Sequence, residues 1–227
     1  MPKISIIIPT YNESQHLPLL LSDLSSLNKG VEIIIVDCNS GDKTRDIANL
    51  YATKIYKSQK KNRGLQLNIG AKQAKGEWFL FLHADSRLCQ DWLKKIKAVI
   101  RKDKTFIYFF KFKINNKNFV YRFLEIVVNL RSYIFKDPYG DQGLLIHRAT
   151  YFENKGYKKI PLMEDIDFIK RLKKTFPLKM LNIPIYTSSR KWEKNTIIFQ
   201  SFKNWNYRKR WLQGESIKSL YDDYYKN

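Results

Sequence analysis

Two short, β-branched apolar segments near the start of the chain constrain its fold most. Residues 4–8 (ISIII) end at Pro9, and residues 31–36 (VEIIIV) end at Asp37. Such runs are typical of strands buried on both faces of a parallel sheet. Leucines recur between them at helical spacing, at Leu17, Leu20, Leu21, Leu24 and Leu27. Because parallel neighbours need a crossover connection, the pattern predicts a β-α-β unit.

The alternation of strand and helix patterns continues beyond this unit. We expect helices at 46–51 and 65–74 and strands at 54–56 and 78–82. The second half is less regular, with expected helices at 92–100, at 119–135 and after Asp165, and an aromatic strand at 106–114. Alternation of this kind predicts an α/β fold, with a mostly parallel sheet and helices on both faces.

Polar residues follow the predicted strands directly. They are Thr10, Asn12, Glu13, Asp37, Asn39, His83 and Asp85. In open α/β sheets, ligands bind beyond the carboxyl ends of the strands. The sequence therefore predicts a ligand site built around these residues.

The chain is strongly basic, with 42 Lys and Arg against 21 Asp and Glu and a net charge of +21. A positive potential attracts anionic partners, and nucleic acid, anionic lipid and phosphorylated substrates all fit. The lysines are spread along the chain and do not form blocks, which equally suits a solvated surface. The segment NWNYRKRWLQ (204–213) interleaves aromatic and basic residues, as a base-stacking surface, a membrane-interface helix or a core helix would.

No apolar run approaches the roughly 18 residues of a membrane-spanning helix, and no signal-peptide pattern opens the sequence. We therefore expect a cytoplasmic protein, with peripheral contact at the inner face of the membrane as an open alternative. Cys38 and Cys89 have no metal-ligand spacing and are expected to be free thiols.

Four motifs carry a family resemblance. They are PTYNE (9–13), VDCNSGDKT (36–44), HAD (83–85) and MED (163–165). In kind, order and spacing they resemble the signature elements of the inverting family 2 glycosyltransferases. NRGLQLNIGA (62–71), GDQG (140–143), LMED (162–165) and SSRKWE (188–193) are similar to an uncharacterised bacterial subgroup, the radical-SAM and selenodomain-associated glycosyltransferase-like proteins.

This resemblance implies a GT-A type nucleotide-diphospho-sugar transferase fold. It also implies transfer of a sugar from a UDP- or GDP-linked donor to an unknown acceptor, with inversion of configuration. We expect one domain over residues 1–227, with a nucleotide-binding half to about residue 86 and an acceptor and catalytic half over about 87–227. No specific nucleic acid is expected as a partner.

The resemblance assigns Asp37 to the nucleotide base, with Thr10 and Tyr11 lining the same pocket. Carboxylates can accept hydrogen bonds from a base N–H or a ribose hydroxyl, which suits Glu13 as well. Arg63 can pair with phosphate or stack on the base, because its guanidinium is planar and always charged.

Structural roles compete with these assignments. Asp37 and Asp42 can instead shape a turn and cap the next helix through short-range hydrogen bonds. Gly64 and Gly70 can permit close packing of the helix that contains them. The packing role of the two glycines is compatible with phosphate binding by Arg63.

Departure of the diphosphate calls for Mg²⁺ or Mn²⁺, held by few carboxylates and by the phosphate oxygens. Asp85 is placed for this, whereas His83 stands where the family commonly has the first Asp of Asp-x-Asp. His83 can ligate the metal, contact phosphate or sugar, or be a hydrogen-bonded structural residue.

Inverting transfer needs a base for the acceptor hydroxyl, and Asp165 matches the family's base. Glu164 joins it in the predicted catalytic pair, because a like charge raises the pKa of its neighbour. The two carboxylates can also be an ordinary acidic helix start. Asp141, Gln142, Arg190 and Trp192 are the predicted sugar and acceptor contacts.

Two other functions were weighed. A sugar nucleotidyltransferase would need a glycine-rich basic loop, but residues 9–13 follow the first strand directly. A G-x-G fingerprint and a P-loop are also absent from the sequence. A non-catalytic protein that binds nucleic acid or an anionic surface rests on the charge and on residues 204–213.

Overall fold

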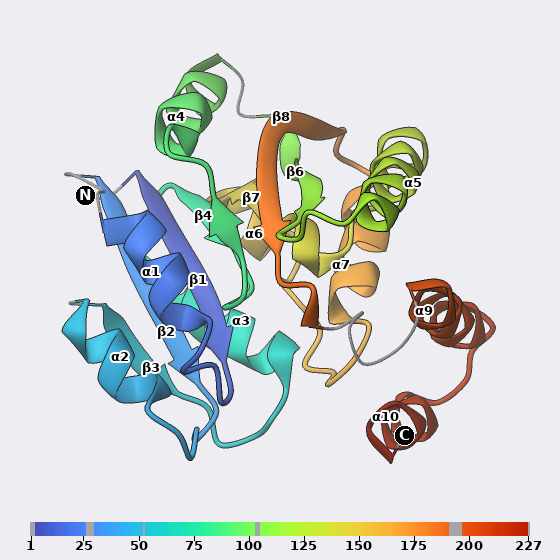
Figure 1. The fold of residues 1–227 in the computed structure, drawn as a ribbon. Helices are drawn as coiled ribbons and strands as arrows, with labels where there is room; N and C mark the ends of the chain where they lie inside the picture. Colours follow the sequence, from blue (N-terminus) through green and yellow to red (C-terminus); the bar gives the residue numbers. More distant parts are fainter. Residues whose placement is uncertain (1–2, 26–29, 52, 103–104, 191–196, 227) are drawn as a thin grey trace.

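A single mixed sheet forms the centre of the molecule (Figure 1). The computed structural model describes residues 3–25, 30–51, 53–102, 105–190 and 197–226. The strands are β1 (Ile4–Thr10), β2 (Val31–Asp37), β3 (Lys54–Lys57), β4 (Trp78–Phe81), β5 (Arg87–Leu88), β6 (Ile107–Ile114), β7 (Leu144–His147) and β8 (Leu178–Thr187). Their order across the sheet is β3-β2-β1-β4-β7-β6-β8-β5.

The first half of the sheet is parallel, as the sequence predicts. β1 lies between β2 and β4 and is parallel to both, and β3 extends this part beyond β2. The second half is mixed, because β7 runs antiparallel to both β4 and β6 while β8 is parallel to β6. The predicted, mostly parallel α/β sheet is thus confirmed, with β5 and β7 as the antiparallel members.

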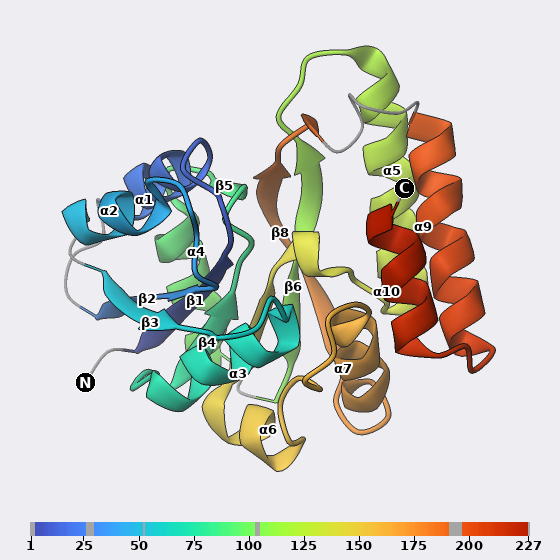
Figure 2. The same cartoon turned by 90° about the horizontal axis from the view of Figure 1, so that it is seen from below.

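Helices cover both faces of the sheet (Figure 2). They are α1 (Leu17–Ser25), α2 (Thr44–Leu50), α3 (Arg63–Gln73), α4 (Trp92–Lys102), α5 (Phe119–Phe135), α6 (Arg148–Glu153), α7 (Glu164–Leu172), α9 (Ile197–Leu212) and α10 (Ile217–Lys226), with a 3₁₀ turn η1 at Gly140–Gln142. One apolar cluster joins α1, α2 and α4 to the sheet, and a second joins α3, α6 and α7 to the other face.

The side chains of β1 show why the sheet needs helices on both faces. Ile4, Ile6 and Ile8 belong to the first cluster, whereas Ile7 belongs to the second. All four are fully buried. Successive strand residues point to opposite faces, so each face must be covered.

Gly70 sets the distance of α3 from the sheet. A Cβ atom there would lie 2.5 Å from Cγ2 of Ile7 and 3.2 Å from Cγ2 of Val36. Gly64, one turn and a half earlier, is closer still, because its Cβ would lie 2.0 Å from the carbonyl oxygen of Lys158. The predicted packing role of both glycines is therefore confirmed.

The C-terminal part departs most from expectation. The sequence pattern does not predict β8, whose pairing with β6 shifts register between Phe110 and Lys111. α9 and α10 join the rest through a small cluster that includes Met163, Tyr207 and Leu220. Leu27 and Trp192, two residues used in the sequence analysis, lie outside the described residues. Among the described helices, none combines the length and the hydropathy required for a membrane span.

Candidate active site

A cleft of about 940 Å³ opens where β1 and β4 end. Its volume is in the range of small-molecule sites. The lining residues from the first half are Pro9, Tyr11, Asn12, Glu13, Lys61, Arg63, His83, Ala84 and Asp85. Those from the second half are Tyr139, Gly140, Asp141, Leu162, Met163, Asp165, Ile166, Thr187, Ser188, Arg190, Lys203, Asn204, Tyr207 and Tyr224. The cleft lies at the strand ends where the sequence predicts a ligand site, and the binding of a ligand there stays a prediction.

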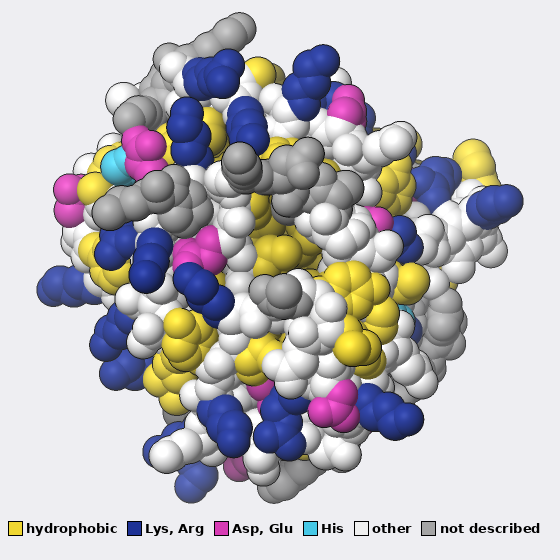
Figure 3. Space-filling view, turned by 90° about the vertical axis from the view of Figure 1, so that its left-hand side faces the viewer, with side chains coloured by type: hydrophobic (Ala, Val, Ile, Leu, Met, Phe, Trp, Pro, Cys, Tyr) yellow, Lys and Arg dark blue, Asp and Glu magenta, His cyan; other side chains and the backbone are white. Residues whose placement is uncertain are grey.

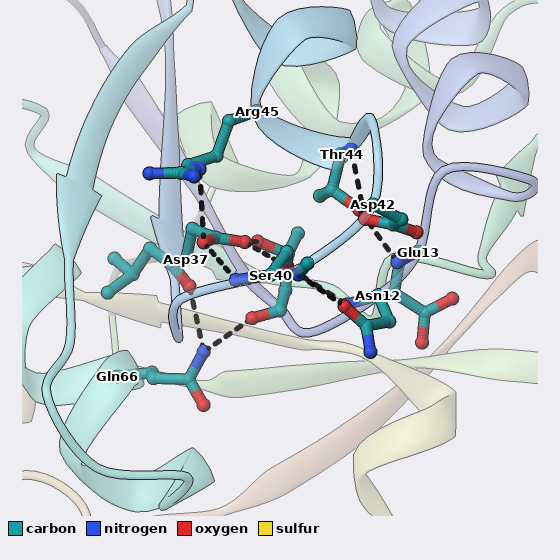
Figure 4. Close-up of polar contacts among 11 residues, drawn as sticks. Asn12, Glu13, Asp37, Ser40, Asp42, Thr44, Arg45 and Gln66 are labelled. Atoms are coloured by element: carbon teal, nitrogen blue, oxygen red, sulfur yellow. Dashed lines mark hydrogen bonds and ion pairs between the residues drawn. The ribbon is translucent and has the colours of Figure 1, made fainter.

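The wall of the cleft beyond β1 is a hydrogen-bonded pair of turns (Figure 4). Asn12, in the left-handed conformation at φ 52°, donates its backbone N–H to Ser40 Oγ at 2.9 Å. Its side-chain oxygen accepts the N–H of Gly41, also at 2.9 Å. The N–H groups of Glu13 and Ser14 go to Thr44 Oγ1 and Asp42. The segments after β1 and β2 therefore hold each other in place.

Asp42 holds the second turn together, as its structural interpretation predicts. Its carboxylate accepts the backbone N–H groups of Ser14 and Thr44, each at 3.0 Å. Partial burial opposes ionisation, but hydrogen bonds from Thr44 and Ser14 outweigh it and lower the pKa of Asp42 to about 2. The turn is therefore anchored by a carboxylate that stays ionised at neutral pH.

Asp37 and Thr10 lie behind this wall and do not line the cleft. Asp37 is fully buried, and its carboxylate accepts hydrogen bonds from Thr10 Oγ1 at 2.9 Å and from the backbone N–H and hydroxyl of Ser40. Arg45 Nε lies 4.0 Å from the same carboxylate. These contacts match the turn-shaping role of Asp37, while its contact with a nucleotide base stays a prediction.

Gln66 joins the same region from α3, and the sequence analysis did not identify it. Its side-chain N–H₂ donates to the carbonyl oxygens of Thr10 at 2.9 Å and Val36 at 2.8 Å (Figure 4). The carbonyl oxygen of Thr10 also accepts the backbone N–H of Cys38 at 3.0 Å. Gln66 therefore ties α3 to the ends of β1 and β2.

One side of the cleft is cationic and aromatic. Lys61 Nζ lies 4.2 Å from the ring centroid of Tyr11, whose side chain is 41% exposed. Arg63, at the first position of α3, lines the cleft beside them. An aromatic ring with two cations suits a planar base and a phosphate group.

Arg190 faces two carboxylates across the cleft. Its Nη2 lies 2.8 Å from Glu13 Oε1 and 3.8 Å from Asp85 Oδ2. The other oxygen of Glu13, Oε2, is buried without a hydrogen-bond partner. The three predicted residues, which come from distant parts of the sequence, therefore lie together.

Asp165 stands at the start of α7 and faces the cleft. Its Oδ2 accepts the N–H of Gly140 and its Oδ1 accepts the N–H of Ile166, each at 2.8 Å. A Cβ atom on Gly140 would lie 2.8 Å from His83 Nε2 and 3.2 Å from Asp165 Oδ2. The imidazole and the carboxylate thus meet at Gly140, which leaves room for both.

Glu164 is not among the residues that line the cleft. Its side chain is 1% exposed and forms an ion pair with Arg63 Nε. Burial raises the pKa of Glu164, against the opposing charge of Arg63, and Asp165 raises it further. The pair ties α7 to α3 beside the cleft, which is lined by Arg63 and by Asp165, the neighbour of Glu164.

The GDQG turn divides its two predicted contacts. Asp141 lines the cleft. Gln142 is fully buried, and its side-chain oxygen accepts the hydroxyl of Ser132 at 2.7 Å while its N–H₂ donates to the carbonyl of Phe110 at 3.3 Å. Gln142 thereby fixes the turn that presents Gly140 and Asp141.

Residues from the end of the chain complete the cleft, and local sequence patterns did not identify them. Lys203, Asn204 and Tyr207 come from α9, and Tyr224 comes from α10. The rings of Tyr207 and Tyr224 pack edge to face, with centroids 5.4 Å apart. In the sequence, a tyrosine at helical spacing cannot be distinguished from a core residue. Only the packing of α9 and α10 in the fold identifies these side chains as part of the cleft.

The basic segment of α9 is partly neutralised. Arg208 pairs with Asp137, and Arg210 lies 2.6 Å from both Glu215 and Asp223. Elsewhere the cations are dispersed: on the face shown in Figure 3, Lys and Arg side chains are scattered with few Asp or Glu between them. The net charge therefore acts as a broad positive field.

Comparisons with known proteins agree with the motifs. The family model for glycosyl transferase family 2 matches residues 5–166. The poly(ribitol-phosphate) β-N-acetylglucosaminyltransferase TarS of Staphylococcus aureus is 27% identical over 99% of this chain and 39% of its own length. An uncharacterized glycosyltransferase of Rickettsia typhi is 42% identical over 37% of this chain and 27% of its own length. The chain thus spans less than half the length of either relative.

Solved structures share the fold. TarS residues 1–349, in complex with UDP-GlcNAc, has a TM-score of 0.67 at 22% identity, covering 83% of this chain and 59% of that one. A mannosyltransferase of Pyrobaculum calidifontis, in complex with GDP-Man and Mn²⁺, has a TM-score of 0.70 at 14% identity, covering 95% and 66%. At these identities the likeness shows the fold, which is of the GT-A type. With the family match over most of its length, the chain belongs to glycosyl transferase family 2.

Proposed function

We propose that this chain transfers a sugar from a nucleotide-diphosphate sugar to an acceptor hydroxyl, with inversion at the anomeric carbon and Asp165 as the base. One observation carries the proposal. Asp165 lines the cleft with each carboxylate oxygen held by a backbone N–H, and Lys61, Arg63 and Arg190 line the same cleft. A fixed carboxylate and a set of cations in one cleft match a proton acceptor and a leaving diphosphate.

The donor would lie along the wall beyond β1. Its base would approach Tyr11 and Lys61, and its diphosphate would be held by Arg63 and Arg190, whose guanidinium groups bind phosphate oxygens in pairs. The predicted UDP or GDP donor is in keeping with the ligands of the two solved relatives, UDP-GlcNAc and GDP-Man. Asp37 would contribute indirectly, because its hydrogen bonds fix the turn that supports the nucleotide base.

The reaction balances with these groups alone. The acceptor oxygen bonds to the anomeric carbon, while the bond from that carbon to the diphosphate breaks and its electron pair leaves with the diphosphate. The acceptor proton passes to Asp165. Asp141 and Arg190 line the same cleft and would position the sugar.

A divalent metal fits the donor side of this site. Asp85 lines the cleft and the neighbouring Glu13 has a buried oxygen without a partner, which suits an added cation. Among the described residues there is no cluster of three or more side chains that could hold a metal by themselves. Mg²⁺ and Mn²⁺ are often held by one or two carboxylates with the substrate's phosphates. Bound there by Asp85, with His83 nearby, the ion would neutralise charge on the diphosphate.

The proposed partner, and with it the proposed location, is an anionic membrane surface. The net charge of +21 supports this, because a positive field attracts anionic lipid. The narrower likeness to the radical-SAM-associated subgroup stays a prediction from the motifs.

Lys61→Ala tests the donor site. We expect the affinity for UDP or GDP, measured by calorimetry with Mn²⁺ present, to fall roughly tenfold, because one charged contact is lost. Lys60→Ala is the matched control, since Lys60 is the adjacent lysine and does not line the cleft. If neither nucleotide binds the unaltered protein at millimolar concentration, the glycosyltransferase proposal fails.

Asp85→Ala tests the metal assignment through binding rather than turnover. In the unaltered protein, we expect Mn²⁺ to strengthen nucleotide binding relative to EDTA. The variant should lose most of that gain while its affinity in EDTA changes little. Asp91→Ala removes an exposed carboxylate that is 2.9 Å from Lys95 and serves as the control. An Mn²⁺ effect that persists in Asp85→Ala would place the metal elsewhere.

A further inference from the structure

One helix carries a long apolar face that the protein leaves exposed. The α5 face consists of Phe119, Val120, Phe123, Ile126, Val127, Leu130, Tyr133, Ile134 and Phe135, whose side chains are 46–82% exposed. Their spacing of three and four residues places them mainly along one side of the helix. Contiguous exposed apolar surface of this kind marks a site of contact with a protein or a membrane.

The opposite side of α5 is tied to the sheet. Glu125, the one acidic residue in the sequence of this helix, is 3% exposed and accepts the N–H of Ile114 at 2.8 Å. It also pairs with Lys113 at 3.1 Å and Arg122 at 2.6 Å. Asn129 donates to and accepts from the backbone of Phe112. The single carboxylate of α5 is therefore turned inward, away from the α5 face.

Basic residues border the α5 face. At about 100° per residue, Arg131 falls at one edge, and Arg122, whose guanidinium pairs with Glu125, falls at the other. Lys117 precedes the helix and Lys136 follows it directly. An apolar face with basic borders is the pattern of a helix that lies in a membrane interface.

α9 adds a second set of exposed apolar residues on the same side of the molecule, the right-hand side in Figures 1 and 2. Phe199, Phe202, Trp205 and Leu212 are 46–62% exposed. Lys209 Nζ lies 5.3 Å from the ring centroid of Trp205. Aromatic rings beside lysines suit the headgroup region of a bilayer.

Charge distinguishes an anionic bilayer from a second copy of this chain as the occupant of the α5 face. A second copy of this chain would bring a net charge of +21 against the same charge, with basic residues at the borders of both faces. Anionic lipid headgroups would instead attract these borders. We propose that the α5 face, with the exposed aromatic side chains of α9, docks on the surface of an anionic lipid bilayer.

Docking at this face would bring the acceptor side of the cleft to the bilayer. Arg131 stacks on Tyr139, with its guanidinium carbon 3.7 Å from the ring centroid, and Ser132 binds Gln142. Tyr139 and the turn that Gln142 fixes line the cleft directly after α5. The docking does not depend on the proposed sugar transfer. The delivery of a membrane-borne acceptor to Asp165 does rest on that proposed function.

Vesicle co-sedimentation tests the docking. The unaltered protein should bind vesicles of phosphatidylcholine with phosphatidylglycerol, and bind phosphatidylcholine alone much less. Phe123→Ser/Leu130→Ser should lower the partition coefficient by at least about tenfold, because two exposed apolar groups no longer enter the interface. Leu50→Ser is the matched control, since Leu50 is 82% exposed on α2, at the opposite side of the molecule (Figure 1).

Three outcomes would overturn the inference. They are equal binding to both kinds of vesicle, an unchanged partition coefficient in the double variant, and a dimer in light scattering that only the double variant dissociates. Circular dichroism and calorimetric UDP and GDP binding of the same variant show that it is folded. Nucleotide binding without vesicle binding removes this inference and the proposed membrane partner but leaves the proposed sugar transfer, whereas vesicle binding without nucleotide binding removes the proposed sugar transfer alone.

Discussion

Asp165→Asn should lower turnover by roughly 10²- to 10⁴-fold, because the variant has no carboxylate to take the acceptor proton. The proposed donor contacts, Lys61, Arg63 and Arg190, are left unaltered, so the affinity for the donor should change little. The structure adds one qualification to this substitution. Both oxygens of Asp165 accept backbone N–H groups, from Gly140 and Ile166. In asparagine only the amide oxygen accepts, because the N–H₂ group is itself a donor, so one of the two backbone N–H groups would face a donor.

The measurement must therefore separate chemistry from geometry. Asp165→Glu keeps a carboxylate but moves it by one methylene, and its rate should be sensitive to pH in the same way as that of the unaltered protein. Single-turnover rates with saturating donor, together with the melting temperature, compare the two variants. Near-normal turnover in Asp165→Asn would contradict the assignment and direct attention to Asp141, which also lines the cleft.

The stereochemistry of the product is a separate check on Asp165. A single displacement inverts the anomeric carbon, whereas a glycosyl-enzyme intermediate would lead to retention. NMR of the product reads the configuration directly. Retention would rule out the direct attack described above, whatever the effect of the substitution.

The parallel half of the fold could be predicted because its signals are local. Residues 4–8 and 31–36 are apolar except for Ser5 and Glu32, which hydrogen-bond to each other, and the structure packs the apolar side chains against helices on both faces. β8 gave no such signal, since Lys179, Asn182 and Pro184 interrupt its apolar residues. It forms because β6 provides a parallel partner, and β6 lies far from β8 in the sequence.

The site was predictable where a residue's position after a strand decides its role. Glu13, His83 and Asp85 follow strands and do line the cleft. The same rule cannot tell which strand-end side chains turn inward, and Asp37 and Thr10 bind each other behind the wall. The contribution of α9 and α10 could not be predicted either, because it depends on how these helices pack near α7.

The charge of the chain shows a similar division. The sequence offers residues 204–213 as a contact for an anionic partner, but Arg208 and Arg210 are engaged with carboxylates of the chain itself. Those carboxylates, Asp137, Glu215 and Asp223, are separated from their partners by 5 to 71 positions. Only the fold shows which cations are paired.

Gly140→Ala should lower turnover by about a hundredfold, although it removes no functional group. Gly140 has no positive φ, so alanine is allowed by the backbone. Its methyl group, however, would lie 2.8 Å from His83 Nε2 and 3.2 Å from Asp165 Oδ2, and one of them must move. A shift of about 1 Å in a catalytic group is enough for an effect of this size.

Gly41→Ala is the control, because a Cβ atom there meets nothing within 4 Å. Nucleotide affinity should be the same in both variants, since Lys61 and Arg63 are untouched. A Gly140→Ala variant with normal turnover would show that the position of Asp165 against Gly140 does not limit the reaction.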